Sequence, residues 1–266
     1  MSNEQKYALI TGGSSGIGYE LAKVFAREKY NLILVARDEQ ELSKCAAELG
    51  QSGVKVLALS KDLFKRKDAY AVYDEVKARG IQVDVLVNDA GQGLYGKFKD
   101  TDLERELDII QLNIGATVIL TKLFLKEMVA RNDGKILQVS SIGGKLPGPW
   151  QSVYHATKAF VLSFSESLHA ELKDTNVTVT ALLPGVTNTD FFNKADMEDS
   201  KMVQESSMSD PAKVAQDGFD ALMAGDNKVI SGLKNKAMVG MNAIMPDSTV
   251  ASTMYEQAKP VDQDKK

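Results

Sequence analysis

The sequence predicts an α/β protein, with one doubly wound parallel sheet, helices on both of its faces, and a single domain. Short apolar runs rich in β-branched residues alternate with longer segments of helical periodicity. Alternation at this pitch is typical of parallel strands joined by crossover helices. Glycine, charged and amide residues follow several of the apolar runs directly, at the carboxyl ends of strands where parallel sheets bind ligands.

The first predicted strand, 7–11, is followed by a glycine-rich turn that reads Gly12-Gly-Ser-Ser-Gly-Ile-Gly18 and then by a helical pattern. This order places backbone N–H groups and a helix N-terminus around an anion. Gly12 permits the turn, Gly16 allows a pyrophosphate to approach, and Gly18 allows the helix to pack on the sheet. The spacing is not the Gly-x-Gly-x-x-Gly fingerprint, and a glycine-rich turn by itself is more often only a turn. The flanking strand and helix nevertheless favour phosphate binding.

The second predicted strand, 31–36, ends at Arg37. The end of this strand is where a βαβ nucleotide site meets the adenosine ribose. An acidic residue there would bond the ribose hydroxyls, whereas an arginine suits a 2′-phosphate, and Ala36 supplies no competing carboxylate. The alternative is a solvated arginine at a helix start, before the first-turn acids Asp38 and Glu39. We favour the phosphate interpretation.

The alternation continues through a strand at 54–59, a helix at 64–79 and a strand at 83–87. Asp62-Leu63 closes the third strand, and Asn88-Asp-Ala-Gly91 follows the fourth. These residues, like the glycine turn and the arginine, fall at the carboxyl ends of predicted strands. Their coincidence predicts a single nucleotide site at that edge of the sheet.

A long apolar-periodic segment, 103–129, predicts a helix that contains Asn113, although asparagine is a mediocre helix former. Asn113 is either a satisfied core amide or a functional residue. A strand at 136–140 follows, and a loop of glycines and prolines then leads to a helix over 154–173.

Tyr154 and Lys158 are four residues apart on this last helix and therefore share a face. Ser141, at the strand end, can be folded over them by the loop. The tyrosine–lysine spacing alone is uninformative, because it recurs at residues 19/23, 73/77, 95/99 and 255/259, where a solvated helix face is the default interpretation. Only the pair at 154 and 158 follows a strand that ends in paired serines.

The sixth predicted strand, 177–183, ends at Pro184-Gly185, again at the site edge. Residues 187–209 lose the apolar rhythm and look like an excursion over the site. Phe191, Phe192 and Met197 could close on an apolar ligand there, or could simply cover the sheet.

Asp210-Pro211 has the cap-then-proline form of a helix start, and that helix is predicted to run to residue 224. A short last strand, 228–230, follows. A helical stripe of apolar residues at 233–245 indicates a packing or subunit contact, and 256–266 should be frayed. We therefore expect a dinucleotide-binding and catalytic domain at 1–232 and a partly helical C-terminal extension at 233–266.

Composition argues for a cytoplasmic protein. A net charge of -4 and a pI near 5.4 argue against a nucleic-acid partner. Cys45 is the only cysteine, which excludes an intrachain disulfide and fits a reducing compartment. The polar N-terminus leaves no room for a signal peptide, and no apolar run reaches the roughly 18 residues of a spanning helix. We expect no membrane partner.

Over residues 6–232 the sequence resembles the compact, single-domain short-chain dehydrogenases/reductases, which have a Rossmann-like fold. Thr11-Gly-x-x-x-Gly-x-Gly18 matches the cofactor turn of that family, and Asp62 matches its adenine-side acid. Asn88-Asp-Ala-Gly91 departs from the family's Asn-Asn-Ala-Gly at its second position. Pro184-Gly185 followed by Thr189 resembles the segment that holds the nicotinamide carboxamide. Alanine followed by arginine at 36 and 37 resembles members that use NADP(H).

The resemblance implies the site residues. The catalytic set is Asn113, Ser141, Tyr154 and Lys158, with Ser141 preferred over Ser140 because the family's serine lies thirteen residues before the tyrosine. Besides this tyrosine and lysine, the cofactor-binding set is Gly12, Ser14, Ser15, Gly16, Ile17, Gly18, Arg37, Asp62, Leu63, Asn88, Ala90, Gly91, Pro184, Gly185, Thr187 and Thr189. No metal site is predicted.

The expected activity is NADP(H)-dependent hydride transfer between nicotinamide and a carbonyl or secondary alcohol. Tyr154 would act as general acid/base, with its pKa lowered by Lys158. Five residues, expected near the pocket mouth, suggest an apolar or aromatic substrate: Leu94, Tyr95, Trp150, Phe191 and Phe192. Two alternatives stay open, a 3-ketoacyl thioester reductase and a non-catalytic NADP-binding sensor or scaffold. The resemblance also implies a homo-oligomer, a dimer or a tetramer.

Overall fold

The structure is a computed structural model that describes residues 6–261 of the 266-residue chain. Its seven strands form one parallel sheet in the order β3-β2-β1-β4-β5-β6-β7. The strands are β1 Tyr7–Thr11, β2 Asn31–Ala36, β3 Val56–Ser60, β4 Val85–Asn88, β5 Gly134–Val139, β6 Val177–Leu183 and β7 Lys228–Ile230. The strand order reverses direction next to β1, which places a crevice at the carboxyl ends of β1 and β4.

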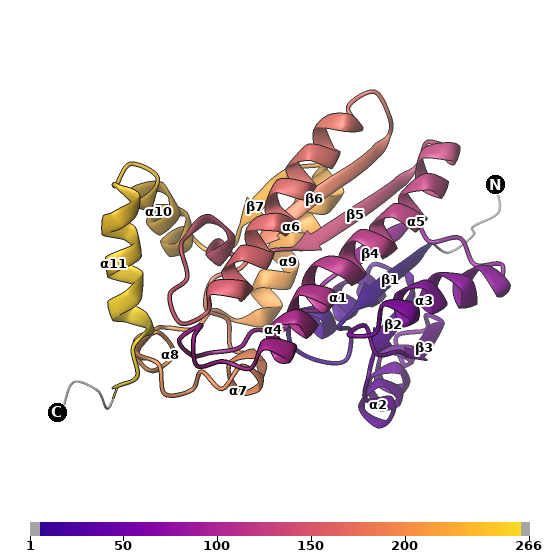
Figure 1. Cartoon of the computed structure of the whole chain (residues 1–266). Coiled ribbons are helices and arrows are strands. Elements are labelled where there is room, and N and C mark those ends of the chain that lie inside the picture. The colour runs from indigo at the N-terminus through magenta and orange to yellow at the C-terminus, as the bar shows by residue number, and fades with distance from the viewer. Residues whose placement is uncertain (1–5, 262–266) are drawn as a thin grey trace.

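Helices cover both faces of the sheet, as Figure 1 shows. Those that follow the strands are α1 Gly16–Arg27, α2 Glu39–Gly50, α3 Arg66–Ala78, α4 Leu103–Ile110, α5 Thr117–Arg131, α6 Ser152–Glu171 and α9 Pro211–Ala224. The remaining ones are α7 Phe191–Lys194, α8 Lys201–Glu205, α10 Leu233–Asn242 and α11 Asp247–Ala258. The predicted doubly wound α/β fold in a single domain is confirmed.

Alternate residues of each central strand face opposite layers. Ile10 of β1 packs with α1 and α9 on one face, whereas its neighbour Leu9 packs with α5 on the other. Both side chains and Phe25 of α1 have no solvent exposure, and Leu120 of α5 is 1% exposed. Burying a side chain of this size stabilises the fold by roughly 1.5–3 kcal/mol. Because these strands are buried on both faces, their sequences are continuous runs of apolar residues, and this pattern identified them in the sequence.

The helix expected over 103–129 is interrupted. A π-helical turn, Gln111–Ala116, separates α4 from α5 and contains Asn113. A π-turn inserts an extra residue into the helix and often occurs at a functional site. The other expected boundaries shift by only one or two residues. The confirmed helix start at Pro211 has Asp210 as its N-cap, which accepts the Ala212 N–H.

The same segment corrects the expectation that nothing in the chain is long and apolar enough to span a membrane. The helical run Leu103–Arg131 meets that test by length and composition. Core helices of globular proteins pass the same test, and here Leu120, Phe124 and Met128 pack against the sheet. The hydropathy of this run is therefore weak evidence for a membrane span.

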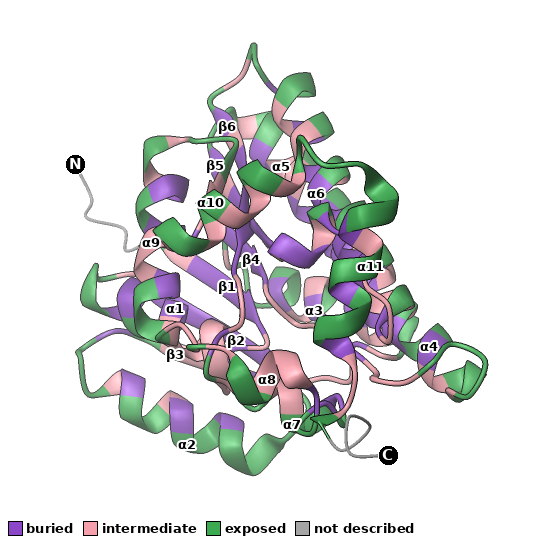
Figure 2. Cartoon of the chain, turned by 90° about the vertical axis from the view of Figure 1, so that its left-hand side faces the viewer, coloured by how far each residue is buried: buried purple, intermediate pink, exposed green. Residues whose placement is uncertain are grey.

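The end of the chain is more ordered than expected. Residues 256–258 belong to helix α11, although frayed structure was expected from 256 onward, while 262–266 lie outside the described residues. Figure 2 shows α10 and α11 beside the sheet, with exposed outer faces. The expected excursion over 187–209 contains the short helices α7 and α8. The division between domain and extension at residue 232 stays a prediction.

Candidate active site

A cavity of about 660 Å³ lies at the carboxyl ends of the central strands. Its floor is formed by the glycine turn after β1, the loop after β4 and the start of α6. The predicted site residues that line it are Gly12, Ser15, Gly16, Ile17, Ala90, Gly91, Ser141, Tyr154, Lys158, Pro184, Gly185, Thr187 and Thr189. The fold thus brings together residues that are up to 177 positions apart in the chain, from Gly12 to Thr189.

The glycine turn has the backbone geometry that its glycines were expected to provide. Gly12 and Gly16 have φ angles of 71° and 56°, which favour glycine. A β-carbon on Gly18 would lie 2.4 Å from the Gly12 carbonyl oxygen and 2.5 Å from Asp89 Oδ2. Ser15 is the N-cap of α1, but its hydroxyl accepts none of the helix N–H groups. The positive end of α1 therefore faces a concave backbone surface suited to an anion.

Asn113 ties the loop after β4 to helix α6. Its Oδ1 accepts the Gln92 N–H at 3.0 Å, and its Nδ2 donates to the Gln92 carbonyl and to Thr157 Oγ1, both at 2.9 Å. The side chain is 1% exposed and does not line the cavity. A β-carbon on Gly91 would lie 3.3 Å from Asn113 Oδ1 and 3.2 Å from Lys158 Nζ. The Asn113 amide and the Lys158 ammonium therefore both lie next to Gly91, which forms part of the cavity floor.

Lys158, Tyr154 and Ser141 converge as predicted. Lys158 is 5% exposed, and its Nζ donates to the Val139 carbonyl at 2.8 Å. That nitrogen lies 5.8 Å from the centroid of the Tyr154 ring. Ser141 follows β5, accepts the Gly143 N–H at 3.0 Å, and hydrogen-bonds the Tyr154 hydroxyl. A hydroxyl, a phenol and an ammonium thus share one wall of the cavity.

The expected lowering of the Tyr154 pKa by Lys158 is wrong for this structure. Burial raises the pKa of Tyr154 to about 12, the Ser141 hydrogen bond opposes that shift, and the negative charge of Asp89 adds to it. Burial lowers the pKa of Lys158 to about 8, against the opposing effect of Asp89. Desolvation of the phenolate therefore sets the direction of the shift, and the Lys158 nitrogen is already bonded to a backbone carbonyl.

Several predicted cofactor residues lie outside the cavity wall. Asn88 is buried in the sheet, where its Nδ2 donates to Thr121 Oγ1 at 3.0 Å and to Gln138 Oε1 at 3.1 Å. Gly18 is buried in α1, and the Ser14 carbonyl accepts a hydrogen bond from Cys45 Sγ at 3.4 Å. Direct cofactor contacts from these three residues stay a prediction.

The residues after β2 and β3 form a separate group beyond the cavity. Arg37 is exposed, and its guanidinium lies 4.7 Å from the centroid of the Phe64 ring. Asp62 Oδ1 accepts the Phe64 N–H at 3.3 Å, and Leu63 is buried in the core. These residues follow neighbouring strands and form the edge of the crevice where the adenine half of a dinucleotide is expected.

The upper wall of the cavity bears on two interpretations of the sequence, and the predicted packing of the stripe at 233–245 is confirmed for Met238, which contacts two core clusters. Phe191 and Phe192 line the cavity, as expected. Apolar residues of α8, α10 and α11 also line the cavity: Met202, Leu233, Met238, Met241 and Met254. Three of them, Leu233, Met238 and Met241, belong to the stripe at 233–245, for which a packing or subunit contact was predicted. Met197 is 1% exposed in the core.

Leu94, Tyr95 and Trp150 are not on the cavity wall. Tyr95 stacks on Trp150 with ring centroids 5.3 Å apart, and Trp150 lies 6.4 Å from Tyr255 of α11. The Tyr95 hydroxyl donates to the Ala258 carbonyl. Two of these residues therefore attach α11 to the domain, which a local sequence pattern does not reveal.

Gln151 is a cavity residue that the sequence reasoning missed. Its side chain is 5% exposed, and Nε2 has no hydrogen-bond partner in the described part of the chain. A β-carbon on Gly93 would lie 3.2 Å from that nitrogen and 3.4 Å from Tyr154 Cδ2. Its position three residues before the tyrosine, at the N-cap of α6, was the available signal.

Residues 6–200 match the family of short chain dehydrogenases. The chain belongs to this family. It is 34% identical to the oxidoreductase UcpA of Salmonella typhimurium over 209 residues, 78% of this chain and 79% of that protein. It is 36% identical over 185 residues to a very-long-chain 3-oxoacyl-CoA reductase of Anas platyrhynchos, covering 67% of this chain. That match spans only 58% of the duck protein, and a match to a short chain dehydrogenase of Pseudocercospora fijiensis spans 59% of it.

Solved structures give the same family. A short-chain dehydrogenase from Sphingobium yanoikuyae in complex with NADPH superposes with a TM-score of 0.80 at 30% identity, covering 91% of this chain and 97% of that one. An enzyme from Burkholderia phymatum in complex with NAD has a TM-score of 0.83 at 22% identity, covering 91% and 94%, and shares the fold. A nicotinamide cofactor is therefore supported. Within residues 6–261, no group of three or more His, Cys, Asp or Glu side chains could hold a metal ion.

Proposed function

We propose that this chain is an NADP(H)-dependent carbonyl reductase or alcohol dehydrogenase, with Tyr154 as its general acid/base. The convergence of Tyr154, Lys158 and Ser141 beside the glycine turn carries the proposal. A protein that only binds a dinucleotide needs the turn but has no use for a half-buried phenol beside a serine hydroxyl. The family supports an oxidoreductase, while the cofactor preference, the substrate and the role of the tyrosine are proposals.

The floor of the cavity fits a dinucleotide. The turn presents backbone without β-carbons at Gly12 and Gly16, and Gly91 leaves open the space in front of Lys158 Nζ. Thr187 and Thr189 line the opposite side, where a carboxamide could find polar partners. When bound, the nicotinamide supplies the hydride, and the chain's own residues supply binding, orientation and the proton.

In the reduction direction, the substrate oxygen gains negative charge as the reaction proceeds, and Tyr154 donates a proton to it. A phenol with a pKa of about 12 is fully protonated at neutral pH, so the acid is ready before substrate arrives. Ser141, one hydrogen bond from that phenol, holds the substrate oxygen in line with it. Lys158, still largely charged below its pKa of about 8, stabilises the phenolate left after proton transfer. Asn113 positions α6 through Thr157 and fixes the loop at Gln92, so it acts on Lys158 as a positioning residue.

Arg37 supports a preference for NADP(H) over NAD(H). Arg37 is exposed at the end of β2, and its guanidinium lies 4.7 Å from the centroid of the Phe64 ring, where a 2′-phosphate can meet it. A charge-assisted hydrogen bond of this kind is worth roughly 1.5–3 kcal/mol, or about ten- to a hundredfold in affinity.

The cavity wall supports an apolar carbonyl substrate. Beyond Tyr154 the wall is formed by two phenylalanines and several methionines, and thioether side chains adapt to ligands of varied shape. A 3-ketoacyl thioester is the second candidate, favoured by the likeness to a very-long-chain 3-oxoacyl-CoA reductase. Net charge -4 gives no support for an acidic carrier protein as the partner. A bulky ketone or aldehyde without a carrier is therefore the first choice.

A screen with purified protein tests the proposal. NADPH oxidation is followed with ketones, aldehydes and acyl thioesters of increasing apolar bulk, with the wild type and Tyr154→Phe in parallel. The proposal expects turnover that rises with apolar bulk and is lost in the variant. NADPH binding without turnover of any carbonyl would favour the alternative, a non-catalytic NADP-binding sensor or scaffold.

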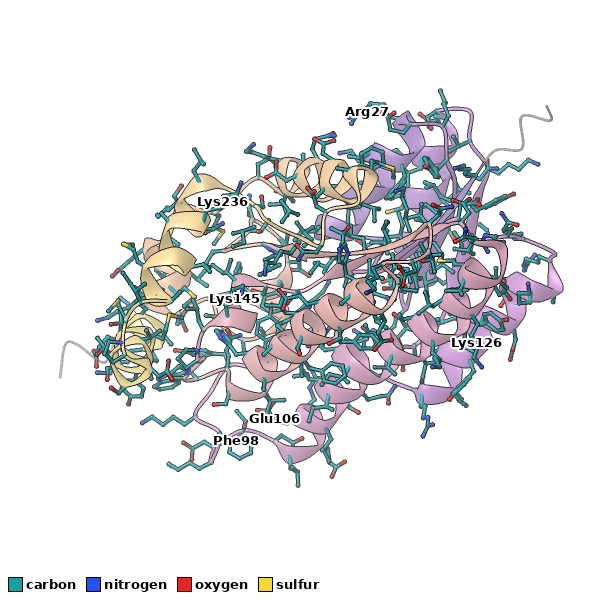
Figure 3. The ribbon with its side chains drawn as sticks, turned by 90° about the horizontal axis from the view of Figure 1, so that it is seen from above. Arg27, Phe98, Glu106, Lys126, Lys145 and Lys236 are labelled. Atoms are coloured by element: carbon teal, nitrogen blue, oxygen red, sulfur yellow. The ribbon has the colours of Figure 1, made fainter. Side chains whose placement is uncertain are left out.

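We also propose that the chain forms a homo-oligomer in the cytoplasm. Apolar side chains of α4, α5 and α6 are exposed, among them Leu103, Leu107, Val129 and Phe160. Figure 3 shows Phe98, which is 61% exposed, projecting from the loop before α4 beside Glu106. Such a surface fits a second copy of the chain. Light scattering on the eluted protein should give the mass of a dimer or a tetramer, and a monomer would contradict this assignment.

A further inference from the structure

Asp89 stands in the active site where the family motif has an amide. It follows β4, and its backbone N–H donates to Thr11 Oγ1 at 3.1 Å. Its side chain turns toward the glycine turn and the start of α1, where Oδ2 lies 3.1 Å from the β-carbon position of Gly12 and 2.5 Å from that of Gly18. Asp89 also lines the cavity. A carboxyl group therefore lies directly beneath the surface proposed to bind the cofactor diphosphate.

Two kinds of group surround this carboxyl. Helix α6 presents Lys158 and Tyr154, whose titrations are coupled to the charge of Asp89. The turn and α1 present backbone groups: the Gly18 N–H points at the carboxylate, and the Gly12 carbonyl oxygen lies 2.4 Å from the same Gly18 β-carbon position. An amide could donate to that carbonyl and accept from that N–H. A carboxyl can do both only while it carries its proton.

Burial raises the pKa of Asp89 to about 7, although Lys158 and the Gly18 N–H both oppose the shift. Protonated and ionised forms are thus both populated in the range where enzymes work. The ionised form places a negative charge under the turn and beside a carbonyl oxygen. It would therefore weaken the attraction of α1 for a dinucleotide diphosphate.

We propose that Asp89 positions the glycine turn for the cofactor and that its protonation is linked to cofactor binding. The neutral carboxyl group holds the turn in the conformation that binds the dinucleotide, whereas the ionised carboxylate weakens binding of the diphosphate. This inference rests on the proposed function, because it assumes that the cavity binds NADP(H). Cofactor binding then takes up a proton at Asp89. The dissociation constant for NADPH increases as pH rises through neutrality, by at most about tenfold per pH unit, the limit for one linked proton.

Asp89→Asn separates this role from a merely structural one. Asparagine keeps the shape of the side chain, can serve both backbone groups and cannot ionise. NADPH binding is measured by fluorescence titration from pH 6 to 9 for both proteins. Because a 2′-phosphate itself titrates near pH 6, the difference between wild type and variant is the readout, and NADH, which lacks that group, repeats the comparison.

The expected result is similar affinity near pH 6 and a widening advantage for Asp89→Asn as the pH rises. A second measurement follows the side-chain carboxyl carbon of Asp89 by NMR in ¹³C-labelled protein, with the signal assigned from its loss in the variant. It should titrate near pH 7 in the free protein and at higher pH with NADPH bound. Parallel pH profiles of the two proteins, or a carboxyl that titrates near pH 4, would overturn the inference. Failure of both proteins to bind NADPH at any pH would instead overturn the proposed function.

Discussion

Replacing Gly18 by alanine tests the architecture of the cofactor turn. The added β-carbon would lie 2.4 Å from the Gly12 carbonyl oxygen and 2.9 Å from the carbonyl carbon, closer than real β-carbons approach. These are backbone atoms, and the Gly12 N–H is anchored to the Val35 carbonyl of β2 at 2.8 Å, so the turn cannot relax cheaply. Overpacking costs about 1–3 kcal/mol, and rigid backbone neighbours place this variant at the upper end.

Alanine also recovers up to about 1 kcal/mol of helix propensity, because residue 18 lies in α1. The net expectation is a loss of about 1–2 kcal/mol, or roughly 2–8 °C in melting temperature for a chain of this size. NADPH affinity should fall at least tenfold, because the turn must move away from Asp89 and α1.

Gly240→Ala is the matched control, since a β-carbon in that part of α10 meets no atom within 4 Å. Circular dichroism melts and NADPH titrations of both variants make the comparison. Gly240→Ala should melt no lower than the wild type. If Gly18→Ala also melted like the wild type and bound NADPH normally, the packing assigned to the turn would be wrong.

Three further predictions concern charge. Arg37→Ser should reduce the kcat/KM preference for NADPH over NADH about ten- to a hundredfold, and an unchanged ratio in steady-state kinetics would contradict the role of Arg37. For carbonyl reduction, kcat/KM should fall as pH rises through about 8, because burial lowers the pKa of Lys158 and its ammonium is lost above that value. Asp89→Asn should move this decline to lower pH, since the negative charge of Asp89 raises the Lys158 pKa; a decline at the same pH in both proteins would argue against that coupling.

The features that were predictable from sequence are those set by neighbours along the chain. Continuous apolar runs identify strands buried on both faces. The glycines at the junction of the turn and α1 are required by the positive φ angles of Gly12 and Gly16 and by the approach of Gly12 to Gly18. Asp210 and Pro211 mark a helix start because capping is a local interaction. The arrangement of Ser141, Tyr154 and Lys158 followed from a strand, a loop and a helix in fixed order.

Features that depend on distant contacts could not be predicted. The docking of α11 depends on Tyr95 and Trp150, which lie roughly 100 to 160 residues before it and gave no signal beyond their apolar character. The π-turn at Asn113 leaves the apolar periodicity of the segment nearly intact, so periodicity alone predicts one uninterrupted α-helix. The pKa of Tyr154 depends on how deeply the phenol is buried, and spacing along a helix does not determine that.

The central claim is that the phenol of Tyr154 supplies the proton for carbonyl reduction. Single-turnover reduction of the best carbonyl substrate by NADPH-loaded Tyr154→Phe tests it most directly, with Tyr255→Phe as the control from a tyrosine–lysine pair on α11. Tyr154→Phe should bind NADPH nearly as well as the wild type but reduce substrate about 10²–10⁴-fold more slowly, while Tyr255→Phe stays near the wild-type rate. Near-normal reduction by Tyr154→Phe would show that another group is the acid.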